Sequence, residues 1–272
     1  MNLNIPDELK DLEFYTVQEV PGVIKETEGE WDLRGNVDEY LGNTFFKDKS
    51  VLELGPASGF LTFYMESKGA DVTCVELSTK NDKWDVVPNC KKDWKKMELD
   101  HRMNDLTKLQ KAFWFSHKAN NSKAKVINTH IYNLGSQVEQ YDIALLGSVL
   151  LHLQNPFLAI KNMLTHTKST AIITDLLPNP SLPFLTRVIN KLIPSTKLKN
   201  FSDPVFYFLP SIKNNHDFAW WKFNPSAIIK MVGLLGFEDC KVTYHNALQF
   251  NKPRALFTVT CQRTVPIKKC NY

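Results

Sequence analysis

Short apolar runs alternate with amphipathic stretches along much of the chain. The runs at 50–55 (SVLELG) and 71–77 (DVTCVEL) have the length of buried strands, and residues 59–70 between them carry the apolar stripe of a helix. Gly69 stands where that helix should end. A strand, a helix and a strand in such a short span predict a right-handed βαβ unit in a parallel sheet.

The pattern continues towards the C-terminus. Strands are predicted over 124–130, 141–147 and 169–177, with a helix over 153–167. A helix over 224–237 has a proline near its start and Gly236 near its end. The last strands, 238–245 and 255–262, are joined by a segment too short for a helical crossover, so they should pair antiparallel. The prediction is an α/β fold with a seven-stranded, mostly parallel sheet, helices on both faces and an antiparallel C-terminal hairpin.

Segments without this alternation of predicted strands and helices mark the divisions of the chain. Residues 1–45 are predicted to form an N-terminal helical or cap segment, 46–262 the main domain, and 263–272 a C-terminal tail. The main domain carries two predicted insertions, 79–124 and 178–224. The second contains six prolines and is too long for a simple connection, which predicts a functional lid.

Composition and net charge restrict the kinds of protein that this chain could be. The net charge of +4, without a long basic run, permits an anionic ligand but does not require nucleic acid. No apolar run approaches the roughly 20 residues of a membrane helix, and the N-terminus does not resemble a secretory signal. The five cysteines are dispersed and lack CxxC spacing, which argues against a disulfide framework or a zinc site. We therefore predict a cytoplasmic protein without a metal; the sequence does not indicate its oligomeric state.

The turn after the first strand, VLELGPASGF at 51–60, indicates a nucleotide. A glycine turn between a strand and a helix exposes backbone N–H groups and permits close approach of a ligand. The dinucleotide pattern GxGxxG fails because Ala57 and Phe60 replace required glycines, and the P-loop spacing and lysine are missing. Glu76, at the end of the next strand, can accept hydrogen bonds from both ribose hydroxyls. The pattern favours an adenosine with an amino-acid tail over a dinucleotide.

These residues resemble the class I methyltransferases that depend on S-adenosylmethionine (SAM) and have a Rossmann-like fold. The resemblance covers about residues 31–262. It implies SAM as cofactor and S-adenosylhomocysteine as product, with the turn at 53–59 against the methionine part and Glu76 at the ribose. Trp84 and the stretches WDLRG (31–35), LLGSVLLHLQNP (146–156) and WWKFNP (220–225) resemble, more narrowly, a branch that includes the tRNA wobble-uridine carboxymethyl-transfer enzymes.

The resemblance also assigns residues at the other strand ends. Gly147 and Ser148 would line the methionine end of SAM. His130 stands where the family more often has an acid, so either its side chain or the Ile131 backbone contacts adenine, or His130 only caps and packs. Arg34 would bind the methionine carboxylate, or else form a surface salt bridge. The predicted cofactor-binding residues are Arg34, Glu53, Gly55, Pro56, Ala57, Ser58, Gly59, Glu76, Leu77, His130, Ile131, Gly147 and Ser148.

Candidates for the acceptor site are mostly aromatic. Histidine is the usual general base near neutral pH, which makes His152 the candidate base, although a histidine within a leucine run is often only packed. The candidate acceptor-binding residues, each with core packing or loop surface as the alternative, are Trp31, Tyr40, His216, Trp220 and Trp221.

Three functions agree with these residues. The first is a SAM-dependent methyltransferase that acts on an O or N atom of a small polar acceptor; the GSVL motif at 147–150 is unlike the NPPY type that holds exocyclic amines of bases. The second is an RNA-modifying methyl or carboxymethyl transferase of the wobble-uridine kind, for which basic residues at 91–96 and 187–200 offer only thin support. The third is a SAM-binding protein without catalysis, which the intact glycine turn and Glu76 disfavour.

Overall fold

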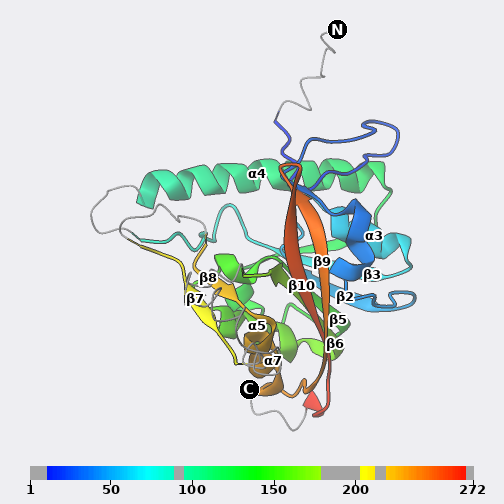
Figure 1. The fold of residues 1–272 in the computed structure, drawn as a ribbon. Coiled ribbons are helices and arrows are strands. Elements are labelled where there is room, and N and C mark those ends of the chain that lie inside the picture. The colour runs from blue at the N-terminus through cyan, green and yellow to red at the C-terminus, as the bar shows by residue number, and fades with distance from the viewer. Residues whose placement is uncertain (1–10, 89–94, 179–202, 212–218, 268–272) are drawn as a thin grey trace, which may run out of the picture.

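The computed structural model describes residues 11–88, 95–178, 203–211 and 219–267 (Figure 1). Its main sheet has eight strands in the order β1-β9-β10-β6-β5-β2-β3-β4, and β7 and β8 form a separate pair. The strands are β1 (Trp31–Asp32), β2 (Ser50–Leu54), β3 (Asp71–Glu76), β4 (Lys125–Asn128), β5 (Tyr141–Gly147), β6 (Thr167–Leu176), β7 (Phe206–Phe208), β8 (Trp221–Phe223), β9 (Asp239–Gln249) and β10 (Lys252–Gln262).

The described helices connect these strands. The α-helices are α2 (Val37–Tyr40), α3 (Phe60–Ser67), α4 (Lys95–Ala119), α5 (Pro156–Thr165) and α7 (Pro225–Gly233). Three short 3₁₀ turns are η1 (Arg34–Asn36), η2 (Ile131–Asn133) and η3 (Leu150–His152). No described helix is long and apolar enough to cross a bilayer.

Pairing in the sheet confirms the predicted fold class. Strands β2 to β6 run parallel, while β10 pairs antiparallel with both β6 and β9. The strand count is corrected from seven to eight, because the short β1 pairs antiparallel with β9 through Trp31 and Gln249. Only two residues form β1, and its position depends on the distant β9, so local periodicity gave no sign of it.

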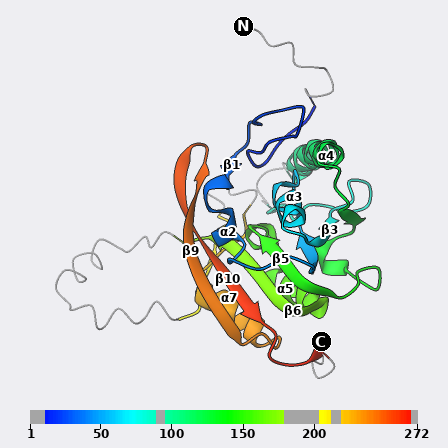
Figure 2. The same cartoon turned by 90° about the vertical axis from the view of Figure 1, so that its right-hand side faces the viewer.

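Helices cover both faces of the sheet (Figure 2), and each face has its own core. One core unites α5 and α7 with residues such as Leu52, Leu146 and Phe257. The other unites the N-terminal segment, α3 and α4 with residues such as Val51, Leu145 and Ile172. Neighbouring residues of β2 and β5 thus face opposite cores, as the two-residue period of a strand requires.

Polar caps set the helix boundaries near the site. Helix α5 begins at Pro156 because the side chain of Asn155 accepts a hydrogen bond from Leu158 N at 3.1 Å. Asn224 caps α7 in the same way through Ala227 N at 3.0 Å. The first cap starts α5 just beyond η3, so the loop after β5 keeps a fixed course past the sheet edge.

The N-terminal segment and the predicted insertions have mixed structure. Within 11–45 only η1 and α2 are helical, and the remainder consists of turns, loops and short bridges beside β1. Within 79–124, helix α4 forms the crossover between β3 and β4. Of the 178–224 stretch, residues 179–202 and 212–218 lie outside the described residues, and the remainder includes β7 and β8.

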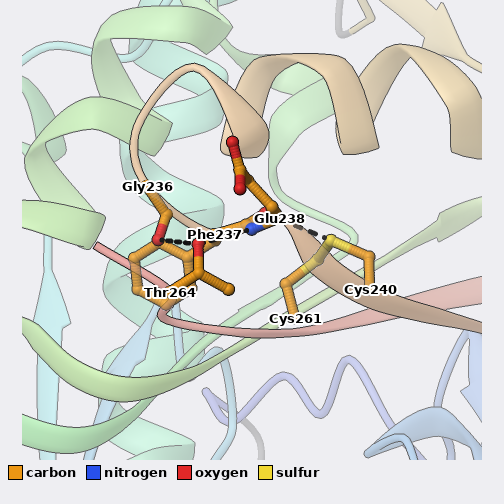
Figure 3. The surroundings of a disulfide bond; sticks show 6 residues. All are labelled: Gly236, Phe237, Glu238, Cys240, Cys261 and Thr264. Atoms are coloured by element: carbon orange, nitrogen blue, oxygen red, sulfur yellow. Dashed lines mark hydrogen bonds between the residues drawn. A yellow bond between two sulfur atoms is a disulfide. The ribbon is translucent and has the colours of Figure 1, made fainter.

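Two of the five cysteines are joined in the hairpin (Figure 3). Cys240 of β9 and Cys261 of β10 are ladder partners with Cα atoms 4.1 Å apart, and their sulfur atoms form a disulfide. Beside it, Glu238 N donates to Thr264 Oγ1 at 3.4 Å and closes the end of the hairpin. The expectation of unpaired cysteines is therefore wrong for this pair, since the register of two strands brings together residues that are distant in sequence. The cytoplasmic location stays a prediction, and the cysteines no longer support it, because disulfides are rare in a reducing cytoplasm.

Candidate functional site

The carboxyl ends of the parallel strands β2 to β6 meet at one edge of the sheet, where open α/β sheets bind ligands. The loop after β2 is the glycine turn, β3 ends at Glu76, and β5 ends at Gly147. The segment between β3 and α4 adds Trp84, and α2 adds Tyr40. The structure therefore brings most of the sequence-predicted residues to one edge.

Both glycines of the turn have left-handed backbone conformations. Gly55 has φ +79° and Gly59 has φ +92°, a region that side chains with a Cβ rarely adopt. A Cβ on Gly55 would lie 2.9 Å from Val149 Cγ2, and one on Gly59 would collide with the Phe63 ring. The glycines are thus required by the packing of the protein itself, and the open backbone that a ligand could approach results from the same conformation.

Glu53 lies beneath the turn and is fully buried. Thr62 Oγ1 donates to its Oε2 at 2.5 Å, and the Cys74 thiol lies 3.7 Å from the same oxygen. Burial raises the pKa of Glu53 to about 7, although both hydrogen bonds oppose this rise. These partners belong to α3 and β3, so Glu53 joins the turn to the sheet; its contact with a cofactor stays a prediction.

Glu76 ends β3 next to the turn. Its Oε1 accepts a hydrogen bond from Leu77 N at 2.7 Å, and the Ala57 backbone donates to the same carboxylate. Burial raises the pKa of Glu76 to about 7. A small pocket adjoins this carboxylate and is lined by Pro56, Ala57, Glu76, Gln110, Phe113, Trp114, Val126 and Asn128.

The lining of this pocket offers groups that a nucleoside could contact. The partly buried Glu76 carboxylate can accept hydrogen bonds from ribose hydroxyls, and the half-exposed Trp114 offers a flat apolar surface. Sequence reasoning missed Gln110, Trp114 and Asn128. The only signal in the sequence was Trp114, an aromatic residue at an exposed position of a helix. It indicates a binding site only once α4 is placed against β3 and β4.

His130 takes the capping role. Its Nδ1 accepts a hydrogen bond from Tyr132 N at 3.2 Å at the start of η2, and the two rings lie 4.5 Å apart. Ile131 is buried, and its carbonyl accepts from Asn162 Nδ2 at 3.0 Å. The structure thus shows the alternative in which His130 caps and packs; a contact of either residue with adenine stays a prediction.

Gly147 and Ser148 are linked to the N-terminal segment through Tyr40. The Tyr40 hydroxyl lies 3.0 Å from Ser148 Oγ, and a Cβ on Gly147 would lie 2.9 Å from that hydroxyl. The Tyr40 ring is buried and stacks on His245 with centroids 5.7 Å apart. Tyr40, predicted for the acceptor site, therefore lies where β5 ends.

Arg34 and Trp31 have protein partners elsewhere. Arg34 is paired with Asp32 at 2.7 Å and with Glu26 at 2.7 Å, and 42% of its side chain is exposed. The Trp31 ring is buried, and its Nε1 donates to Tyr15 Oη at 3.2 Å. The surface salt bridge is thus the alternative seen for Arg34, and its predicted bond to the methionine carboxylate stays a prediction.

His152 and the tryptophans lie around the segment that follows β3. The His152 ring, in η3, is 5.9 Å from the Trp84 ring in an edge-on arrangement. Trp220 is buried and donates from Nε1 to Asp85 O at 2.7 Å, while Trp221 is partly exposed. His216 lies outside the described residues. The packing alternative therefore holds for Trp220, whereas Trp221 keeps an accessible face.

Asp175 is an acid that sequence reasoning did not select. It is the penultimate residue of β6, before Leu176, and is only 2% exposed. Its Oδ1 accepts from Leu176 N at 2.7 Å, while its Oδ2 is buried without a hydrogen-bond partner in the structure. Burial raises the pKa of Asp175 to about 7. The signal in the sequence was one acid within an otherwise apolar strand, which is also common at strand ends.

A family profile described as "Methyltransferase domain" matches residues 29–238 of the chain. The chain belongs to this family. The protein is a methyltransferase. This result agrees with the resemblance read from the glycine turn, Glu76 and the C-terminal hairpin.

Solved structures share the fold of this methyltransferase. The N-terminal domain of EvdMO1, crystallised with S-adenosylhomocysteine and D-fucose, has a TM-score of 0.55 and 12% identity, and the match covers 95% of this chain and 94% of that one. A SAM-dependent methyltransferase from Methanosarcina mazei has a TM-score of 0.51 and 12% identity, covering 82% and 96%. No curated protein matches the sequence. At these identities the likeness supports the fold alone.

Proposed function

We propose that this methyltransferase transfers the methyl group of SAM to an O or N atom of a small polar acceptor. The observation that carries the proposal is the partly buried Glu76 carboxylate beside the glycine turn at the carboxyl edge of the sheet. SAM supplies an electrophilic methyl group, so the main task of the protein is to position an acceptor in line with it and exclude water.

Different residues at the carboxyl edge of the sheet would perform different parts of this task. Glu76 would accept the ribose hydroxyls, and the backbone between Gly55 and Gly59 would lie against the amino-acid part of SAM. A Cβ on Gly147 would lie 2.9 Å from the Tyr40 hydroxyl. The glycine therefore allows Tyr40 to pack against the end of β5, where the backbone would stay accessible to the cofactor. The methyl group would then face the ends of β5 and β6.

A covered edge favours a small acceptor. The loop after β3 is fastened across the strand ends, because Asp85 Oδ2 accepts from Tyr132 Oη at 2.6 Å and from Gln154 N at 2.8 Å. Trp220 bonds the same loop through Asp85 O. His152, beside Trp84, is the predicted base on this side. We propose that the acceptor enters between this loop and Tyr40, with Trp221 at the entrance.

The resemblance to the wobble-uridine branch leaves an RNA acceptor as the alternative result of the experiments below. Carboxymethyl transfer would require a cationic group for the additional carboxylate. Arg34, the cation predicted for the methionine carboxylate, is already paired with Asp32 and Glu26. We therefore place methyl transfer to a small molecule first.

Calorimetry tests the cofactor site. The wild-type protein should bind SAM and S-adenosylhomocysteine and not NAD. Glu76→Ala should weaken S-adenosylhomocysteine binding by about 1–3 kcal/mol, because the ribose loses a charged acceptor. Glu238→Ala is the matched control, since this exposed acid stands at the opposite edge of the sheet and should leave the affinity unchanged. Equal affinity of the Glu76→Ala variant would contradict the ribose assignment.

Isotope transfer tests the acceptor. The enzyme is incubated with SAM carrying a tritiated methyl group and a cell extract separated into small molecules, RNA and protein. Label in the small-molecule fraction supports the proposal, and D-fucose is a first defined probe because it was crystallised with the EvdMO1 domain. Label confined to RNA, with binding weakened by salt, would favour the wobble-uridine alternative.

A further inference from the structure

Asp175 is held in a way that costs folding free energy. Its carboxylate is 2% exposed at the end of β6, and only Oδ1 has a hydrogen-bond partner, Leu176 N. Oδ2 has no partner among the described residues. A buried carboxylate oxygen without a partner is unfavourable, so its presence calls for an explanation, and a ligand that supplies the missing bond is one.

Its location is the reaction edge. Gly147 and Thr174 are partners in the β5–β6 ladder, and Ser148 N donates to Thr174 O at 2.8 Å. Ser148 and Asp175 therefore each follow the last residue pair of the β5–β6 ladder. The Tyr40 hydroxyl, 3.0 Å from Ser148 Oγ, adds a third polar group at this point.

The described groups nearby do not neutralise Asp175. Tyr15 and Tyr40 are the titratable side chains whose pKa values its charge raises, after the larger effect of their own burial. Neither is a cation or a hydrogen-bond partner of Oδ2. The burial that raises the pKa of Asp175 to about 7 is thus uncompensated by an ion pair.

We propose that Asp175 is an acceptor-binding residue whose Oδ2 accepts a hydrogen bond from the acceptor, next to Tyr40 and Ser148. The acceptor class is then a compound that presents an O–H or N–H group at the end of β5 and β6. This inference rests on the proposed methyl transfer and specifies the groups that select its acceptor. Asp175 orients the acceptor, while the cofactor is held by the residues of β2 and β3.

A thermal comparison tests the inference without a known acceptor. Asp175→Asn keeps Oδ1 for Leu176 N and removes the unpaired charge, so its melting temperature should exceed that of the wild type at pH 8. The difference should shrink as pH falls below 7, where the folded carboxyl becomes protonated, and should disappear only near pH 4, the ordinary carboxyl pKa. Asp142→Asn is the control, because Asp142 accepts from Ser50 N at 2.9 Å and Ser50 Oγ at 2.8 Å and should lose stability on substitution.

Methyl transfer supplies the second readout. Asp175→Asn should bind S-adenosylhomocysteine within twofold of the wild type and transfer at least tenfold less label to the fraction that the wild type labels. A lower melting temperature of Asp175→Asn at pH 8, or labelling at the wild-type rate, overturns the role of Asp175. Failure of the wild type to bind S-adenosylhomocysteine overturns the proposed function instead. If the wild type binds S-adenosylhomocysteine but labels no fraction, the proposed methyl transfer is overturned and the role of Asp175 with it.

Discussion

At the scale of single residues, the glycine turn serves packing and access together. Gly59 begins α3 with φ +92°, and the rings of Phe63 and Phe113 fill the space where a Cβ would stand. Because the glycines at 55 and 59 have no side chains, a ligand could approach the backbone of the turn closely at both positions. Its structural and binding roles are therefore separable only by measuring both stability and affinity.

Gly59→Ala should be destabilising by at least about 1–2 kcal/mol, the cost of a left-handed backbone for a residue with a Cβ, with the collision at Phe63 in addition. Thermal denaturation measures the loss. Gly35→Ala is the control, because a Cβ there meets nothing within 4 Å. An unchanged melting temperature for Gly59→Ala would show that the turn adopts another conformation.

At the scale of elements, the hairpin β9–β10 depends on long-range pairing. Its strands continue through most of the segment predicted as a connection, and the chain reverses at Phe250 and Asn251, both of positive φ. The same register places Cys240 opposite Cys261. This hairpin joins β6 on one side and β1 on the other, so it holds the N-terminal segment to the domain.

Reduction of the Cys240–Cys261 disulfide should lower the free energy of unfolding by about 2–4 kcal/mol, as expected when a closed loop is released in the unfolded chain. Urea denaturation with and without reductant measures the change. A Cys240→Ala/Cys261→Ala double variant should not respond to reductant. Titration of both thiols in the denatured, unreduced protein would contradict the bond.

At the scale of the whole molecule, three carboxyl groups with raised pKa values lie at the carboxyl edge of the sheet. Burial raises the pKa values of Glu53, Glu76 and Asp175 each to about 7. The folded protein therefore binds more protons than the unfolded chain between the ordinary carboxyl pKa and pH 7. Holding these carboxyl groups away from water lowers the stability of the protein at neutral pH. A ligand that donates hydrogen bonds to them would recover part of that stability.

The stability of the ligand-free protein should thus fall as pH rises from about 4.5 to 7 and then level off. His245 opposes this trend, because burial lowers its pKa and its contribution rises towards pH 6.5. With three carboxyls against one imidazole, we expect the melting temperature at pH 8 to be lower than at pH 5 by several degrees. Saturating S-adenosylhomocysteine should reduce the difference, since the ribose hydroxyls would stabilise the Glu76 carboxylate. A higher melting temperature at pH 8 would contradict the raised pKa values.

The sequence by itself determined the α/β class, the five parallel strands and the antiparallel hairpin. It also indicated a tight glycine turn and an acid at the end of the next strand, because strand and helix periods and the left-handed conformations of Gly55 and Gly59 are local properties. Tertiary structure alone decided the eighth strand, the disulfide, the pairing of Arg34 with acids and the capping role of His130. It also decided that Asp175, near the end of β6, has a carboxylate oxygen without a hydrogen-bond partner among the described residues. These features depend on register and burial between segments distant in the chain, and local residue patterns do not encode which side chain finds a partner.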